Sequence, residues 1–347
     1  MSQQLSEYFK NVYPILCQNS SGSFSKFLES KENFVDTCRL ITLIFLPLQL
    51  FTFYCILKKT PKAMDSVKSS LLNLNFWYTF CGIFYSFLST PYFFYPHSAI
   101  FFIGVLVDLG IPNEFIYFSQ LFISFLIVLA FLILFENRSS LIVNNIFRFQ
   151  NNSTRNLWIF MNITGCMVPF IPVYFNLPDS DEARVNVLKS LPCPPKYFFT
   201  ENILVFPDGF WFNYLSATIL FSNGTLFLQI LFFSVCCLYY LFYAKSSQVS
   251  SETRRLQIRS FFGIVLQTTI PFLLVLIPTI LFSINTHPEI FDQSKNNLTF
   301  LPLVFHKGIG SLCIVLVHFP YRSFLFSLIF CKKQTDNKIT NVPTPIS

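Results

Sequence analysis

The sequence predicts an all-α membrane protein, a bundle of seven transmembrane helices with the amino terminus outside the cell and the carboxyl terminus inside. Of its 347 residues, 53% are hydrophobic and only 12% are charged, whereas a soluble domain carries about 25% charged residues. A single soluble core cannot hide so much apolar surface, because such cores stop growing beyond roughly 250–300 residues. The apolar residues also form uncharged stretches that match the roughly 20 residues needed to cross a bilayer.

Seven such stretches are long enough to span the membrane. They cover residues 40–57, 71–94, 115–135, 157–177, 210–244, 261–284 and 301–319. An eighth apolar stretch, 98–112, is shorter and contains Asp108, so we expect it to form the outer ends of the second and third helices and their connection. The chain is then divided into an extracellular tail (1–33), a seven-span domain (34–330) and a cytoplasmic tail (331–347).

Positive charges are distributed unevenly between the connections. The first, third and fifth connections hold four, three and four Lys or Arg residues, and four more follow the last span. The second connection holds none, and the fourth and sixth hold four in total. Since cytoplasmic loops are enriched in Lys and Arg, the odd-numbered connections and the carboxyl-terminal tail are predicted to face the cytosol. The net charge of +7 therefore reflects membrane topology, and we expect no nucleic-acid partner.

Ionisable groups are almost absent from the predicted spans, which argues against catalysis. Spans one to six contain no Asp, Glu, Lys, Arg or His, although functional chemistry within a membrane usually depends on such groups. The four histidines are isolated, and neither a GxSxG nucleophile motif nor a glycine-rich phosphate loop occurs. We therefore expect no enzyme activity, no catalytic residues, no metal site and no cofactor.

Four local patterns stand in a fixed order between the spans. Phe135–Arg138 (Phe-Glu-Asn-Arg) closes the third span, and Lys59–Pro61 (Lys-Thr-Pro) follows the first span. Leu191–Pro195 (Leu-Pro-Cys-Pro-Pro) lies in the fourth connection, and His318–Arg322 (His-Phe-Pro-Tyr-Arg) ends the seventh span. With these motifs, the chain resembles the nematode serpentine receptors of class H over about residues 39–322.

The resemblance implies a G-protein-coupled chemosensory receptor with this seven-helix fold. It would bind a small extracellular molecule and activate a heterotrimeric G protein, with the plasma membrane, and by family resemblance sensory-neuron cilia, as its location. A ligand-gated channel or carrier that shares the seven-span layout remains the alternative. The second span lacks the buried Asp that receptors of this general kind often carry, and no Cys lies between Cys81 and Cys166 to form their usual outer disulfide.

Two groups of residues are predicted to carry the function. Lys307, beside His306 in the last span, would meet an acidic ligand group or snorkel outward; the family pattern has His-Gly where this chain has His-Lys-Gly. A basic face at the cytosolic side would contact both anionic lipid and the G protein. The predicted coupling and switch residues are Glu136, Arg138, Arg254, Arg255, Pro320, Tyr321 and Arg322.

Covalent features are expected on the outer face. Only Cys17 and Cys193 fall clearly in predicted extracellular segments, where conditions favour oxidation, so either they form a disulfide or each is a free thiol. Asn19 and Asn297 begin glycosylation sequons on the same side. The sequons in the third connection are predicted to be cytosolic and unmodified.

Overall fold

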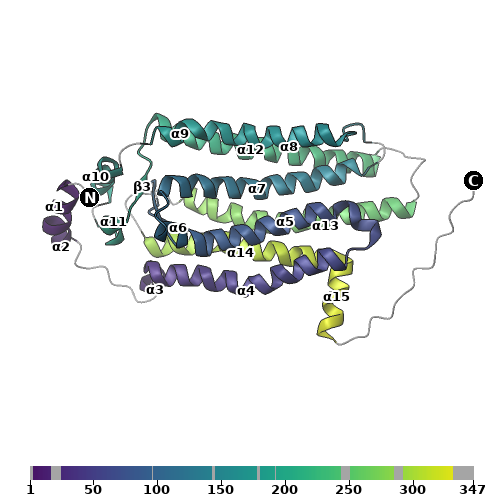
Figure 1. Cartoon of the computed structure of the whole chain (residues 1–347), viewed down its shortest axis with the longest axis horizontal. Helices are drawn as coiled ribbons and strands as arrows, with labels where there is room; N and C mark the ends of the chain where they lie inside the picture. Colours follow the sequence, from purple (N-terminus) through teal and green to yellow (C-terminus); the bar gives the residue numbers. More distant parts are fainter. Residues whose placement is uncertain are drawn as a thin grey trace, which may run out of the picture.

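The computed structural model describes residues 3–16, 25–95, 97–142, 145–177, 180–191, 193–243, 251–284 and 292–330. In this part of the chain, seven long helices lie side by side and form an elongated bundle (Figure 1). They are α4 (Lys31–Lys58), α5 (Asp65–Ile83), α7 (Asn113–Ser140), α8 (Asn152–Met167), α12 (Phe210–Leu238), α13 (Ser251–Ile284) and α14 (Gln293–Val317). The helices α7 and α5 lie between α8 and α12 on one side and α4 and α14 on the other (Figure 1).

Short elements extend or connect the long helices. Those before α7 are α1 (Gln3–Glu7), η1 (Tyr8–Val12), α2 (Tyr13–Leu16), α3 (Ser25–Glu29), η2 (Lys62–Met64), η3 (Phe84–Leu88), β1 (Thr90–Phe93), β2 (Ala99–Ile103) and α6 (Val105–Asp108). Those after it are η4 (Val168–Phe170), α9 (Ile171–Phe175), α10 (Ser180–Ser190), α11 (Tyr197–Thr200), β3 (Leu204–Val205), η5 (Tyr239–Tyr243) and α15 (Phe319–Ile329).

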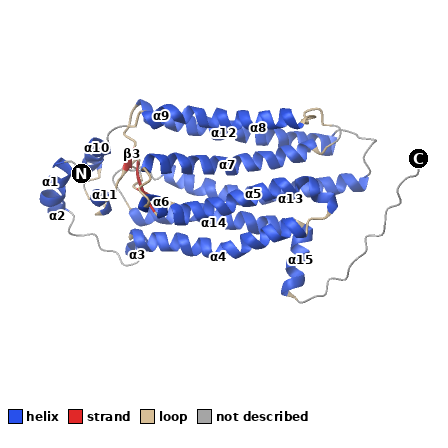
Figure 2. Cartoon of the chain, viewed as in Figure 1, coloured by secondary structure: helices blue, strands red, loops and turns tan. Residues whose placement is uncertain are grey.

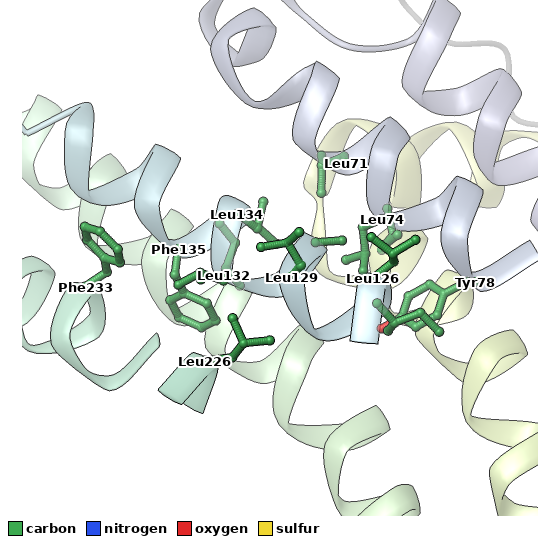
Figure 3. Packing of buried hydrophobic residues seen from close by; sticks show 14 of the residues in the cluster. Leu71, Leu74, Tyr78, Leu126, Leu129, Leu132, Leu134, Phe135, Leu226 and Phe233 are labelled. Carbon is green, nitrogen blue, oxygen red and sulfur yellow. The ribbon is translucent and has the colours of Figure 1, made fainter. Parts of the chain in front are cut away.

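The core of the bundle is apolar and is centred on α7. Leu71, Leu74 and Tyr78 of α5 pack towards the Leu126–Phe135 part of α7, and Phe233 of α12 reaches the same helix (Figure 3). Many large apolar side chains on the outer helices are exposed in the isolated chain. This arrangement, with a packed interior and an apolar exterior, is the one expected for a bundle whose solvent is lipid.

The seven-helix prediction is confirmed. Within the described residues, six helices are long and apolar enough to cross a membrane by themselves. The seventh is α5, which has 19 residues and continues into the 5-residue π-helical turn η3. At about 1.5 Å per residue, this continuous segment is about 36 Å long, which exceeds the roughly 30 Å of the hydrocarbon layer.

The outer part of the second predicted span is a β-strand rather than a helix. The helical segment ends at Leu88, and residues 90–93 form β1, which pairs antiparallel with β2 in the register Thr90 to Ile103. Proline disfavours helical geometry in the preceding residue, so Pro91 accounts for the end of the helix. The stretch 98–112 is indeed a connection, but it holds β2 and α6 instead of helix ends, and β3 completes the sheet (Figure 2).

A folded cap covers the end of the bundle that carries the sheet. The cap consists of residues 3–16, the three strands, and residues 180–191 and 193–206, and it buries apolar side chains from all of these segments. Tyr13 Oη donates a hydrogen bond to the Pro194 carbonyl at 2.9 Å, and the rings of Phe9 and Phe199 are 4.8 Å apart. The predicted extracellular tail thus includes helices that pack on the fourth connection.

Candidate ligand site and signalling end

Lys307 lies inside the bundle, where α14 faces α5. Its residue is only 2% exposed, and its Nζ donates to the Leu303 carbonyl at 2.6 Å. The same nitrogen lies 4.4 Å from the centre of the Tyr85 ring. No carboxylate of the described residues pairs with it. The predicted alternative, in which Lys307 snorkels outward, is therefore wrong, because helix packing turns this side chain to the interior.

His306 is also buried, but it contacts a different tyrosine. Its ring lies edge-on to that of Tyr78, with 6.5 Å between the centres. Within the described part of the chain, His306 Nδ1 and Tyr78 Oη are both buried without a hydrogen-bond partner. Tyr78 and Tyr85 lie two turns apart along α5 and η3, so the two adjacent residues of α14 are not brought together in one cluster.

Other polar groups near Lys307 were not predicted from the sequence. Thr42 of α4 and Ser86 of η3 share a buried hydroxyl–hydroxyl hydrogen bond of 2.6 Å. Tyr85 Oη lies 2.7 Å from Ser124 Oγ and donates to the Gln120 carbonyl at 3.0 Å. None of these residues belongs to a motif, and only the packing of four helices places them near one another.

At the opposite end of the bundle, the α15 end, Glu136 pairs with a neighbouring helix. Its side chain is 1% exposed, and its Oε2 lies 2.7 Å from Nε of Arg155 in α8. Ser140 Oγ donates to its other oxygen at 2.7 Å. Glu136 does not pair with Arg138, because residues two positions apart lie on different faces of a helix and Arg155 occupies the carboxylate.

Arg138 points into the α15 end of the bundle without an acidic partner. Its Nε and Nη2 are buried and have no hydrogen-bond partner among the described residues. Cys237 of α12, Tyr321 of α15 and His318 lie close enough to interact with its charge. The described residues thus leave part of the hydrogen-bonding capacity of this guanidinium unused.

The predicted residues around α15 have mainly structural contacts. Tyr321 is fully buried, with its Oη 2.7 Å from Thr60 Oγ1, so the two family motifs meet here. Pro320 lies in the first turn of α15, where its missing N–H costs nothing. Arg322 donates to the Leu316 carbonyl at 3.0 Å. Together these contacts fix the angle at which α15 leaves the bundle (Figure 1).

The two predicted arginines at the start of α13 have different environments. Arg254 is partly buried and its Nε donates to the Leu241 carbonyl of η5 at 2.5 Å. Arg255 is exposed. Arg255 is therefore accessible at the surface of this end, whereas Arg254 joins two helices.

Comparison with known proteins gives the family. Residues 29–331 match the family described as serpentine type 7TM GPCR chemoreceptor Srh. The chain is also 41% identical over 332 residues to serpentine receptor class H-72 of Caenorhabditis elegans, which covers 95% of this chain and 94% of that receptor. The chain belongs to the Srh family. The resemblance predicted from the motifs is thereby confirmed, and the family is one of receptors.

The Srh chain has a disulfide at Cys193, in the cap. Seven of the other cysteines are free and buried; Cys17, the predicted partner, lies outside the described residues, as does the predicted glycosylation site Asn19. Asn297 is only 2% exposed, and its Nδ2 donates to the Leu28 carbonyl at 2.6 Å. A glycan would have to be attached at this nitrogen, so the prediction of a glycan on Asn297 is inconsistent with the fold.

The described residues contain no group of three or more His, Cys, Asp or Glu side chains that could hold a metal ion. Among these residues, Lys307 and the buried Nε and Nη2 of Arg138 have no acidic partner. The helix α7 takes part in both regions: Tyr85 is hydrogen-bonded to Gln120 and Ser124 of α7, and Arg138 belongs to the same helix.

Proposed function

We propose that this Srh chain is a G-protein-coupled chemosensory receptor. A small extracellular molecule would bind in the bundle near Lys307 and His306, and stabilise an arrangement that activates a heterotrimeric G protein. A ligand can shift such an equilibrium only if it binds one arrangement more tightly than the other. The observation that carries this proposal is the half-buried Arg138, whose buried Nε and Nη2 have no partner among the described residues and would gain one if the α15 end opened to a G protein.

The coupling residues would act in two ways. Glu136, Tyr321 and Pro320 stabilise the resting arrangement through the contacts described above. Arg138 would donate to carbonyl oxygens of the G protein once it is released, and the exposed Arg255 would contact the same partner. The remaining basic residues of this end, Arg254 and Arg322, lie where anionic lipid headgroups would also be attracted.

The proposed orientation puts the cap outside the cell and the α15 end in the cytosol. The distribution of Lys and Arg supports this orientation. We also propose that Cys17 pairs with Cys193: Tyr13, four residues before Cys17, is hydrogen-bonded to Pro194, the neighbour of Cys193. Asn19 would carry a glycan on the same side. The receptor would act in the plasma membrane and, by family resemblance, in sensory-neuron cilia.

The decisive experiment screens a panel of volatile and water-soluble odorants on cells that express the receptor, with a second-messenger readout. An active odorant should promote nucleotide exchange on a Gα subunit. Arg138→Ala should abolish this exchange at unchanged surface expression, whereas Arg148→Ala, at an exposed position of the same connection, should retain it. Ligand-evoked current in bilayers that contain the receptor but no G protein would instead identify a channel, and would refute the proposal.

A further inference from the structure

The ammonium of Lys307 is a positive charge in the interior of the bundle with an incomplete set of partners. Of its three N–H donors, one is used by the Leu303 carbonyl. The face of Tyr85 offers partial compensation through a cation–π contact. A buried cation without an anion is costly, and ionisable residues within a membrane are usually retained for a function. The environment of Lys307 therefore favours the binding of a negatively charged ligand.

A second unused donor lies in the same part of the bundle. In the pair formed by Thr42 Oγ1 and Ser86 Oγ, one hydroxyl donates to the other. The accepting hydroxyl keeps its own hydrogen, for which the described residues provide no acceptor. Both side chains are buried, so water does not readily satisfy this donor. The interior of the bundle thus holds an unused hydroxyl donor, on α4 or η3, and unused ammonium donors on α14.

Gly82 shows that the side chains of Thr42 and Lys307 converge. A Cβ atom at this position would lie 3.8 Å from Thr42 Cγ2 and 3.9 Å from Lys307 Cδ. The glycine thus marks the point where side chains of α4, α5 and α14 meet. Ser86 follows one helical turn later, inside the π-helical turn η3. Such turns occur frequently at functional sites, because the extra residue shifts the following side chains around the helix.

We propose that Lys307, Thr42 and Ser86 form a binding site for the carboxylate group of a small organic acid. This inference rests on the receptor function proposed above and specifies the class of ligand. The carboxylate would pair with the ammonium and accept the free hydroxyl hydrogen. One cationic side chain suits a monovalent head group, and the rings of Tyr85 and Phe45, which lies against Gly308, suit an apolar body.

The site is placed to act on the signalling end. Tyr85, under the ammonium, is bonded to Ser124 and Gln120 of α7, and α7 also carries Arg138. A carboxylate that draws the ammonium away from the Tyr85 ring would weaken the cation–π contact and so alter the interaction of Tyr85 with α7. The ligand would thereby bind one arrangement of α7 more tightly than another, which is the condition for a population shift.

The test measures ligand binding without any G protein, so that it is independent of the receptor function. The purified full chain in nanodiscs of zwitterionic lipid is heated in the presence of hexanoate or of 1-hexanol, which has the same chain without the charge. A parallel series compares potassium chloride with potassium gluconate, because chloride is another source of a monovalent anion. A ligand that binds the folded form raises the midpoint of unfolding with concentration.

We expect hexanoate to raise the midpoint more than 1-hexanol does. Lys307→Met should increase the apparent Kd for hexanoate at least tenfold. Gly82→Ala should have the same effect by filling the site, and its added methyl group meets only ordinary van der Waals distances. The matched control, Lys295→Met, removes an exposed lysine of the same helix and should leave hexanoate binding unchanged.

Three results would overturn the proposal. Equal stabilisation by hexanoate and 1-hexanol would mean that the charge is not recognised. Undiminished affinity in Gly82→Ala and Thr42→Val would exclude this location, even if Lys307→Met failed to fold. Stabilisation by chloride alone would identify a site for a small inorganic ion. Hexanoate binding without nucleotide exchange would instead leave the site in place and refute only the receptor function.

Discussion

The pair between Glu136 and Arg155 gives a quantitative prediction about the α15 end. Glu136 is enclosed by the bundle, whereas the side chain of Arg155 is 31% exposed. Removal of either partner therefore has unequal consequences. Arg155→Met leaves a buried carboxylate without its cation, and only Ser140 still donates to it. Glu136→Gln leaves a cation that water can reach.

The magnitude follows from this asymmetry. Removal of one partner from a buried ion pair costs about 3–5 kcal/mol, and the partial exposure of Arg155 places Arg155→Met near the lower limit, at about 3 kcal/mol. Glu136→Gln should cost about 1 kcal/mol, because the amide can still accept the Ser140 hydrogen bond. The double variant should cost about 1–2 kcal/mol, well below the total of the single changes.

Thermal unfolding of the full chain in nanodiscs measures these differences. A change of 1 kcal/mol shifts Tm by about 2–4 °C in chains of 150–250 residues, and by about 2 °C in this longer chain. Arg155→Met should therefore lower Tm by about 6 °C, and Glu136→Gln by about 2 °C. The matched control Arg148→Met, at an exposed position, should leave Tm unchanged. Equal losses for the two single variants, or an additive double variant, would refute the reasoning.

Three further predictions test other parts of the chain. Gly310→Ala would press a methyl group against the buried ring of Tyr78 and should cost about 1–3 kcal/mol, measured by thermal unfolding; Gly165→Ala, which has open space, should not destabilise. Asn297→Gln should leave the electrophoretic mobility unchanged before and after glycosidase treatment, because Asn297 carries no glycan. Burial lowers the pKa of His97, between β1 and β2, below 6.5, so the folded form binds its proton less readily than the unfolded chain does. Acidification through pH 6.5 should therefore lower Tm, and His97→Gln should reduce this dependence.

For each of these three predictions, a specific result would contradict the structural argument. Gly310→Ala with an unchanged Tm would show that the helices α14 and α5 are less closely packed than described. A mobility shift that depends on Asn297 would show that this side chain is exposed during synthesis and stays modified. A pH dependence that is identical in His97→Gln would assign the titration to another group.

The seven spans and the identity of the family could be predicted from the sequence alone. Bilayer thickness imposes a length on each apolar stretch, and the charged residues that bound the stretches are visible in the sequence. The family motifs are local patterns in a fixed order. Both kinds of signal depend on neighbouring residues, and neither requires knowledge of which helices touch.

The tertiary structure decided the features that depend on contacts between distant residues. The strand at Thr90 forms because β2 and β3 are present to pair with it; hydropathy alone cannot distinguish it from the end of a helix. Arg155 pairs with Glu136 because α8 packs beside α7. Lys307 is interior because α14 presents this face to α5. In each case, the environment of a side chain depends on how its own segment is oriented and on which elements pack beside it. Neither feature can be read from the residues that are its neighbours in the sequence.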